Sequence, residues 1–366
     1  SLPELFILGQ NQNDYDSSEI SDIILALRGF TFNSKAPIYK KESRRWLIPD
    51  AYNSPHYNIA VSCWENCNQS WTASVMQEPN PAHERYRKLC LLLDTFYFHP
   101  NNCRYLILPE LSMPAQWFIY FALKLQSKGI SLIAGIEYFH ENEDSLKMPC
   151  EKEKASSSTK EAEKNTSQTT ILRNQVWEAL THDGLGFPSL MIYRQDKQRP
   201  ALHEELELQR LRGAKLKPGN TWDCPPIIQH GNFHFAILIC SELTNIAYRS
   251  ALRGKIDALF VPEWNQDTET FSALVESAAL DIHAYIIQCN ARQYGDSRIR
   301  APYKESWKRD ILRAKGGETD YCVIGEIDVL KLRQFQSSHR SPDGPFKPVP
   351  DGFEIAPERK VLPASD

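Results

Sequence analysis

Strand-like apolar segments alternate with helical segments along most of this chain, and no other feature of the sequence limits the fold as much. Residues 57–65 and 103–112 are rich in β-branched and aromatic residues, as strands are, whereas residues 81–98 and 115–129 have the apolar spacing of helices. Residues 130–139 form another strand-like segment. Because strand and helix follow one another in turn, the sequence predicts an α/β domain.

The alternation continues through the second half of the chain. A polar turn, "THDGLG", joins apolar segments at 174–180 and 188–195 and predicts a β-hairpin. The further predicted elements are helices over 202–215, 245–255 and 269–283, and strands over 233–240, 257–264, 284–290 and 321–328.

Three segments lack this pattern and set the predicted boundaries of the domain. Residues 1–56 resemble an N-terminal extension or linker with one helical candidate over 17–30, and residues 331–366 resemble a Pro-rich, polar C-terminal tail. Residues 141–170 contain almost no apolar side chain and predict a flexible insertion. The domain itself is therefore expected to span residues 57–330.

The composition excludes several classes of protein. Of the 366 residues, 42% are hydrophobic and 24% are charged, which is typical of folded globular chains. The 42 basic and 46 acidic residues give a net charge of −4, so no overall basic field draws the chain to nucleic acid or to an anionic membrane. No apolar run approaches the roughly 18 residues that a membrane-spanning helix needs.

The expected location of the chain is the cytoplasm. Its first residues, "SLPELFILGQNQND", have neither the charged start nor the small-residue cleavage site of a secretion signal. Nine cysteines, an odd number spread along the chain, suit free thiols in a reducing compartment better than a disulfide framework. Because the chain begins with Ser1 and not with methionine, we expect a trimmed chain or a piece of a longer polypeptide.

Three polar residues stand at the ends of strand-like segments. Glu110 ends "CRYLILPE", Lys197 follows "SLMIYRQD", and Cys240 ends "FHFAILIC". In an α/β sheet, reactive groups gather at the carboxyl ends of strands, where open turns rest on rigid strands. The three side chains are therefore candidates for one site.

A carboxylate, an ammonium group and a thiol complement one another chemically. A thiol is mostly protonated near neutral pH, so it needs a base or a nearby cation to act as a nucleophile. Glu110 suits the base and the later proton donor, while Lys197 and the backbone N–H of Ser241 suit the partners of an oxyanion. The set fits acyl transfer from an amide or nitrile carbon to Cys240 through a thioester.

Each of these residues also has a simpler interpretation. Cysteine is among the residue types that are most often buried, so Cys240 alone predicts an inert core thiol. Glu110 suits a helix cap, and Lys197 suits a solvated lysine, with Lys215 and Lys217 nearby as alternatives for its role. Only the ordered set of three favours catalysis.

Two other kinds of site compete with this set. In a Cys-His hydrolase, Cys240 would pair with His283, whereas His234 is excluded because it lies on the same strand, about 20 Å away at roughly 3.3 Å per residue. Cys63 and Cys67 in "CWENC" are not followed by a second pair of zinc ligands at a suitable spacing. A structural zinc site is therefore not expected.

The order and the flanks of the three residues resemble the nitrilase, or carbon–nitrogen hydrolase, superfamily. "LILPELSMP" is similar to its glutamate motif, "MIYRQDK" to its lysine motif with two extra residues, and "ILICSELT" to its cysteine motif. "DALFVPEW", which contains Pro262 and Trp264, and "IIQCN" followed by "YGDSRIRAP" are similar to later segments of the family. The resemblance spans residues 57–330, apart from the insertion.

This resemblance implies a four-layer αββα sandwich, assembly into homo-oligomers, and cofactor-free chemistry at the C–N bond of a small-molecule amide or nitrile. It implies catalytic roles for Glu110, Lys197 and Cys240. It also implies a second glutamate that supports the lysine, for which Glu205 is the better match and Glu204 the alternative. The residues expected at the substrate or its oxyanion are Ser241, Glu242 and Trp264.

The sequence also departs from the family pattern. Ser241 and Glu242 follow the cysteine where many members have an aromatic residue and an aspartate, and residues 1–56 are foreign to the simple family fold. These departures motivate a second hypothesis, in which the chain is a nitrilase-like interaction or assembly module with altered or no hydrolase activity. One such setting, which this chain resembles, is the nitrilase-like C-terminal domain of defence-associated bacterial reverse transcriptases.

Overall fold

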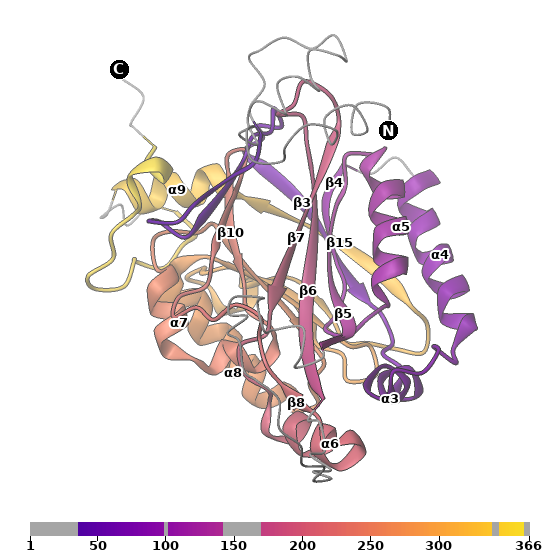
Figure 1. Ribbon diagram of the computed structural model, residues 1–366. Helices are drawn as coiled ribbons and strands as arrows, with labels where there is room; N and C mark the ends of the chain where they lie inside the picture. Colours follow the sequence, from indigo (N-terminus) through magenta and orange to yellow (C-terminus); the bar gives the residue numbers. More distant parts are fainter. Residues whose placement is uncertain (1–35, 99–101, 142–169, 339–343, 362–366) are drawn as a thin grey trace, which may run out of the picture.

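Two β-sheets face each other across one hydrophobic core in the computed structural model (Figure 1). Tyr105 of one sheet contacts Phe233, Phe235 and Phe260 of the other, so aromatic rings fill the space between the sheets. The structure describes residues 36–98, 102–141, 170–338 and 344–361.

The first sheet has eight strands. Its central strands β10, β11 and β12 run parallel, so their carboxyl ends lie at the same edge of the sheet. In spatial order the strands are β1 (Ile38–Lys40), β2 (Arg45–Ile48), β9 (Ile227–His230), β10 (Phe233–Ile237), β11 (Ala258–Glu263), β12 (Tyr285–Asn290), β13 (Ser297–Arg300) and β14 (Asp310–Ala314).

The second sheet has seven strands, one of which lies off the main path. Strands β3, β4 and β5 run parallel, and the predicted hairpin is confirmed as β6 and β7, which pair antiparallel from Gln175 to His182. In spatial order the strands are β15 (Tyr321–Asp328), β3 (His56–Cys63), β4 (Cys103–Ile107), β5 (Ser131–Glu141), β6 (Ile171–His182) and β7 (Ser189–Asp196), while β8 (Lys215–Leu216) pairs with β6.

Helices cover the outer face of each sheet, which confirms the αββα sandwich. In Figure 1, α4 and α5 lie beside the second sheet, and α7 and α8 lie beside the first. Helix α5 buries Phe118, Phe121, Ala122 and Leu125, a spacing that places all four side chains on one face. The helices are α3 (Asn68–Met76), α4 (His83–Phe98), α5 (Ala115–Gln126), α6 (Leu202–Arg212), α7 (Ile246–Leu252), α8 (Thr268–Ala278) and α9 (Val329–Ser338).

Short helical turns complete the described part of the chain. The predicted helix over 269–283 is α8 followed by a π-helical turn, and Asp267 caps its start by accepting a hydrogen bond from the N–H of Thr270. The π turn spans Ala279–His283, and 3₁₀ turns span Cys240–Thr244, Ser306–Lys308 and Pro357–Arg359.

The sheet does not break at the predicted domain boundaries. Strands β1 and β2 belong to the first sheet, where β2 pairs with β9, so residues before 57 contribute to the sandwich. Near the other end, Arg359 is fully buried and hydrogen-bonds to Asp257 beside β11. Strands β1 and β2 have three and four residues, which are too few to show a periodic pattern in the sequence. The helix predicted over 17–30, and the predicted insertion apart from its two end residues, lie outside the described residues.

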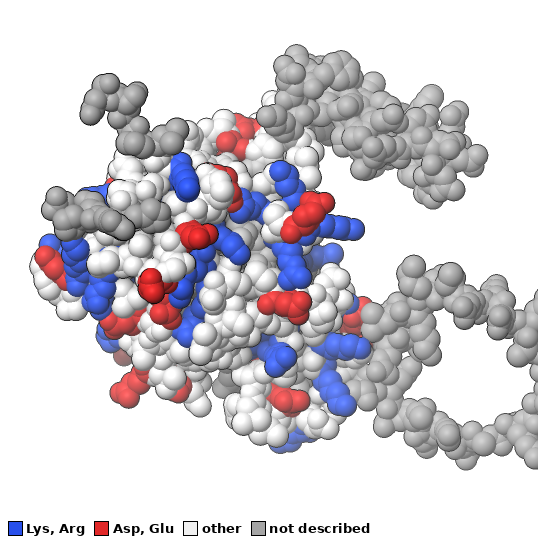
Figure 2. Space-filling view, turned by 90° about the vertical axis from the view of Figure 1, so that its left-hand side faces the viewer, with Lys and Arg blue, Asp and Glu red and all other residues white. Residues whose placement is uncertain are grey.

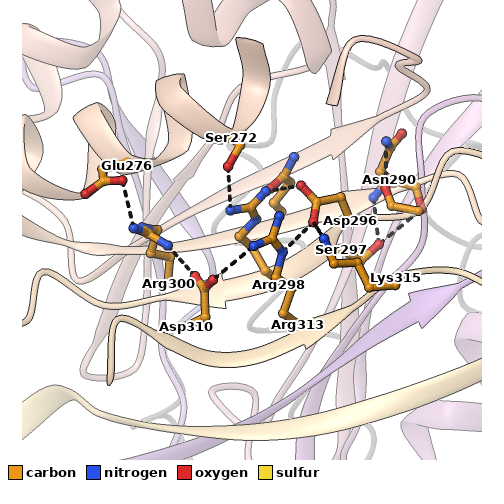
Figure 3. A network of polar contacts seen from close by, with 12 residues as sticks. Ser272, Glu276, Asn290, Asp296, Ser297, Arg298, Arg300, Asp310, Arg313 and Lys315 are labelled. Atoms are coloured by element: carbon orange, nitrogen blue, oxygen red, sulfur yellow. Dashed lines mark hydrogen bonds and ion pairs between the residues drawn. The ribbon is translucent and has the colours of Figure 1, made fainter. Parts of the chain in front are cut away.

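Charged side chains of both signs are mixed on the face that Figure 2 shows, without a continuous basic area. At the edge of the first sheet, β13 and β14 carry a polar network against α8 (Figure 3). There Arg298 contacts Asp296 and lies 3.1 Å from Oγ of Ser272, while Asp310 contacts both Arg300 and Arg313. No helix within the described ranges has both the length and the apolar composition needed to cross a membrane.

Candidate active site

Glu110 lies in a turn after β4 that is hydrogen-bonded to β5 on both sides of the glutamate. The N–H of Gly135 donates to Pro109 at 3.0 Å, and the N–H of Ser112 donates to Gly135 at 2.8 Å. Leu111 has a φ of 54°, so the chain turns sharply after Glu110. This backbone holds the Glu110 carboxylate inside the sandwich, where the residue is 3% exposed.

Lys197 directs its ammonium group at Glu110. Its Nζ lies 2.8 Å from Oε1 of Glu110 and 2.7 Å from Oε2 of Glu204, and the residue is 1% exposed. Burial by itself favours the neutral amine, but the two carboxylates outweigh it and hold the pKa of Lys197 well above its ordinary value. Lys197 is therefore a permanent cation, which suits it to stabilise an anion and not to accept a proton.

The supporting glutamate is Glu204, and the prediction of Glu205 for that contact is wrong. Helix α6 turns Glu205 to the solvent and Glu204 inward. Tyr138 donates its hydroxyl to Oε1 of Glu204 at 2.7 Å, and the N–H of Ala201 donates to Oε2 at 3.1 Å. Desolvation opposes ionisation of Glu204, but the charge of Lys197 and hydrogen bonds from Lys197, Tyr138 and Asn174 lower its pKa.

Asn174 is a site residue that the sequence did not reveal. Its Nδ2 lies 2.7 Å from Oε1 of Glu110 and 2.9 Å from Oε1 of Glu204, so one amide group holds both carboxylates. The available signal was an asparagine within the apolar segment that forms β6, because a buried amide in a strand requires partners.

Cys240 lies beyond the end of β10, where the chain turns into a 3₁₀ helix. Its φ of 49° is in the left-handed region, which only a tight turn imposes on a residue with a side chain. The N–H of Trp264 lies 3.3 Å from Oε2 of Glu110, and it is also one of the groups that act on the Cys240 thiol. Desolvation first, and then Glu110 and Glu263, raise the pKa of Cys240 well above its ordinary value, while Lys197 lowers it.

Glu242 joins the cysteine turn to the lysine turn. Its Oε1 accepts the N–H of Gln198 at 2.7 Å, and its Oε2 accepts the N–H of Ile239 at 2.8 Å. Both oxygens are occupied by the protein's own backbone, so Glu242 positions the turns on either side of Lys197 and Cys240. Desolvation raises the pKa of Glu242 to about 7, against the effect of the two N–H donors.

Glu263 is a further carboxyl group near the thiol that the sequence did not single out. It ends β11 with no exposed surface, and its Oε1 accepts a hydrogen bond from Nε2 of Gln288 at 2.5 Å. Desolvation raises its pKa to about 8, and Glu110 adds to the increase. Glu263 is itself the glutamate of "PEW", and its place at the end of a buried strand was the only signal in the sequence.

The competing sites are not assembled. His283 is fully buried, and its ring contacts Gln336, Phe335 and the carbonyl oxygen of Lys347, so the imidazole belongs to the packing of α9. Burial lowers its pKa to about 4. Among the described residues, no group of three or more His, Cys, Asp or Glu side chains is placed to hold a metal ion, and no disulfide joins two of the described cysteines.

The fold and the site together define a class of protein: an αββα sandwich in which a glutamate, a lysine and a cysteine meet within the buried space at the strand ends. The arrangement can deprotonate a thiol, stabilise a negative charge beside it and return the proton to a leaving group. The predicted residues Glu110, Lys197 and Cys240 are the three that it brings together, and Trp264 contributes its backbone N–H.

Solved structures of nitrilase-superfamily proteins are similar to this chain. Nit3 of Saccharomyces cerevisiae, a member of branch 10 of that superfamily, is 13% identical with a TM-score of 0.49 over 80% of this chain and 98% of Nit3. An amidase from Nesterenkonia sp. is 12% identical with a TM-score of 0.44 over 76% of this chain and 92% of the amidase. A carbon–nitrogen hydrolase superfamily protein from Xanthomonas campestris is 10% identical with a TM-score of 0.46 over 74% of this chain and 90% of that protein.

No protein family and no curated protein sequence matches the chain. The similar structures come from the superfamily that the sequence motifs resemble. The proposed link to a defence-associated reverse transcriptase has no support in them and stays a prediction.

Proposed function

We propose that this protein hydrolyses the C–N bond of a small-molecule amide or nitrile through a thioester on Cys240. The observation that carries the proposal is the arrangement around Glu110. Its Oε1 lies 2.8 Å from Nζ of Lys197, while the N–H of Trp264, 3.3 Å from its Oε2, also acts on Cys240. A fixed cation and a thiol thus accompany one buried carboxylate, which is the base.

For an amide substrate, the first half of the reaction transfers the acyl group. The raised pKa of Cys240 means that the resting group is a thiol, so Glu110 takes the thiol proton as the sulfur attacks the carbonyl carbon. Lys197 stabilises the oxyanion that forms. Glu110 then returns the proton to the nitrogen, the C–N bond breaks, and an amine or ammonia leaves behind the thioester.

The second half releases the acid. Water attacks the thioester carbon while Glu110 accepts its proton, and Lys197 again stabilises the oxyanion. The C–S bond breaks, the sulfur regains a proton from Glu110, and a carboxylic acid leaves. Throughout the reaction Glu204 holds Lys197 in place by direct contact, and Asn174 holds Glu110 in the same way while it also contacts Glu204.

The test is a pair of cysteine variants assayed for ammonia release from a panel of short aliphatic amides and nitriles. Cys240→Ala is expected to abolish release, and Cys67→Ala, a half-buried cysteine outside the set, is expected to keep it. Intact mass spectrometry during turnover is expected to find an acyl adduct on the wild-type protein and none on Cys240→Ala. Full activity of Cys240→Ala, or no turnover of any amide or nitrile by the wild-type chain, would overturn the proposal.

The alternative role as an assembly module makes a different prediction for the same variant. If the chain serves only as a scaffold, Cys240→Ala should keep its biological function, because the substitution removes one sulfur atom and leaves the sheets intact. Loss of that function at an unchanged oligomer mass contradicts the scaffold hypothesis.

A further inference from the structure

The candidate site holds more acid than base. The ammonium group of Lys197 contacts the carboxylates of Glu110 and Glu204, and the carboxyl groups of Glu242 and Glu263 interact with Glu110. Desolvation is the largest effect on the pKa of Glu242 and of Glu263, Glu110 raises both, and Lys197 lowers that of Glu242. One cation is therefore shared among four acidic groups, two of which it contacts directly.

Buried oxygen atoms in the same walls lack a donor. Oε2 of Glu263 and Oε1 of Gln288 have no hydrogen-bond partner among the described residues, and neither side chain is exposed. The same holds for Oδ1 of Asn66 and Oδ1 of Asn174, whose amide nitrogens donate to the carbonyl oxygen and to the carboxylate of Glu110. Those contacts fix the orientation of both amides, because a flipped amide would set oxygen against oxygen. Three of the four atoms are amide oxygens, which can only accept, so this part of the site has more acceptors than donors.

Nearby arginines do not correct the imbalance. Arg298, which acts on Glu263, contacts Asp296 within the network of Figure 3. Arg85 lies 2.9 Å from Oε1 of Glu137. Both guanidinium groups contact carboxylates outside the candidate site, so neither pairs with the acidic groups near the thiol.

We infer that the substrate is an amide or nitrile whose acyl part carries a cationic amino group, and that carboxylate-bearing substrates are disfavoured. This inference rests on the proposed function and assigns its substrate class. An ammonium group supplies both things that the site lacks, a positive charge and hydrogen-bond donors. A substrate carboxylate supplies neither and faces four acidic groups.

A cationic substrate also promotes the chemical step. Glu110 and Glu263 both disfavour ionisation of Cys240, and Lys197 is the only described cation among the groups that oppose them. A second positive charge close to the sulfur favours the thiolate, so binding and activation are coupled. The advantage of the cationic substrate is therefore expected in kcat as well as in KM.

The experiment compares three amides of similar size and different charge on the full chain. They are 4-aminobutanamide, which is cationic, pentanamide, which is neutral, and succinamate, which is anionic. We expect kcat/KM for ammonia release to fall in that order, by at least tenfold at each step. Equal or faster turnover of succinamate or of pentanamide overturns the substrate class and leaves the proposed function standing. No turnover of any amide by a protein that also fails to form a Cys240 acyl adduct overturns both.

A charge variant tests the cause of the preference. At pH 8.5, above the pKa of about 8 of Glu263, Glu263→Gln removes one negative charge next to the thiol, so the ratio of kcat/KM for the cationic over the neutral amide should shrink severalfold at that pH. Glu326→Gln, an exposed position on β15, changes the net charge equally and should leave the ratio unchanged. If Glu263→Gln does not fold, inhibition of the wild-type chain serves instead, with butylammonium expected to compete at least tenfold better than butyrate. An unchanged ratio in folded Glu263→Gln, or equal inhibition by both ions, contradicts the inference.

Discussion

The ammonium nitrogen of Lys197 lies 2.7 Å from Oε2 of Glu204, a residue only seven positions further along the chain. This contact places the first turn of α6 over the end of β7, so the helix closes the site from one side. Because Lys197 also contacts Glu110, its charge is held between two carboxylates and its position is fixed. The catalytic lysine of the proposed mechanism is thus oriented by its own following helix.

Removal of the Glu204 charge should therefore reduce activity strongly. Glu204→Gln deprives Lys197 of one charge-assisted hydrogen bond, worth about 1.5–3 kcal/mol, which corresponds to a loss of about tenfold to a hundredfold in kcat/KM. The measurement is ammonia release from the amide with the highest turnover. Glu205→Gln is the matched control and should stay within about twofold of the wild type, because Glu205 is exposed. Equal losses in both variants would contradict the assignment of Glu204.

The sequence located the three proposed catalytic residues for a physical reason. Parallel strands end at the same edge of a sheet. Because the two sheets are stacked, polar residues at the strand ends of one sheet lie close to those of the other. The choice between Glu204 and Glu205 could not be made in this way, since adjacent residues on a helix differ by about 100° and the helix orientation follows from packing. Asn174 and Glu263 remained hidden because their roles depend on partners from other strands.

The fold was predictable where elements were long. The strands that precede Glu110 and Cys240 and the helices α4, α5 and α8 are long enough to show a regular apolar pattern, and all are confirmed. The short strands β1, β2, β13 and β14 at the two ends of the first sheet were not predicted, because three to five residues with charged members have no distinct period. On β13, Arg298 and Arg300 face the network under α8, so the sequence of this strand is as polar as that of a loop.

The most reactive thiol in the resting protein should be Cys67 and not Cys240. Desolvation opposes ionisation of Cys67, but N–H groups of Ser70 and Gln69, the Ser70 hydroxyl and the charge of Arg85 lower its pKa. Cys240 is 6% exposed, and its pKa is raised. Brief treatment with iodoacetamide at pH 7.5, followed by peptide mapping, should find Cys67 modified first. Cys67→Ser should remove the fast phase, whereas faster labelling of Cys240 would indicate a resting thiolate and contradict the raised pKa.

Glu178 should make the fold less stable at higher pH. The residue is fully buried on β6, neither carboxyl oxygen has a partner among the described groups, and desolvation raises its pKa well above 4.5. As pH rises above that ordinary value, the unfolded chain releases the proton while the folded chain keeps it, so stability falls by at most about 1.4 kcal/mol per pH unit. Glu178→Gln cannot titrate, and its advantage in urea midpoint over the wild type should grow from pH 5 to pH 8.

The matched control for Glu178 is exposed Glu318. The urea midpoint of Glu318→Gln should differ from that of the wild type by the same small amount at both pH values. An advantage of Glu178→Gln that shrinks as pH rises would show that the Glu178 carboxyl is ionised in the folded protein.

Asp257 should be essential for attachment of the C-terminal segment. Its carboxylate accepts hydrogen bonds from Arg333 of α9 and from Arg359, all three being at least nine-tenths buried. Desolvation opposes ionisation, but the two guanidinium groups hold the pKa of Asp257 below its ordinary value. Asp257→Asn leaves two buried cations with too little opposing charge and should lower the free energy of unfolding by about 3–5 kcal/mol, measured by urea denaturation. Asp351→Asn, at an exposed position, should change it by less than about 0.5 kcal/mol, and a similar small effect of Asp257→Asn would contradict the prediction.

Gly135 should control the position of Glu110 although it carries no side chain. A methyl group at Gly135 would lie 2.4 Å from Cα of Glu110 and 2.4 Å from the nitrogen of Leu111, both of which are backbone atoms that cannot move aside cheaply. Gly135→Ala should therefore displace the carboxylate from Lys197, and a shift of about 1 Å is enough to reduce kcat by about a hundredfold. Gly352→Ala is the control, because a methyl group there meets nothing within 4 Å and its φ of 68° costs about 1 kcal/mol of stability. Both variants are expected to lose some stability, so kcat is compared on folded protein. A loss of kcat in Gly135→Ala alone shows that the close approach of β5 to the Glu110 turn sets the catalytic geometry. Equal kcat in the two variants would contradict it.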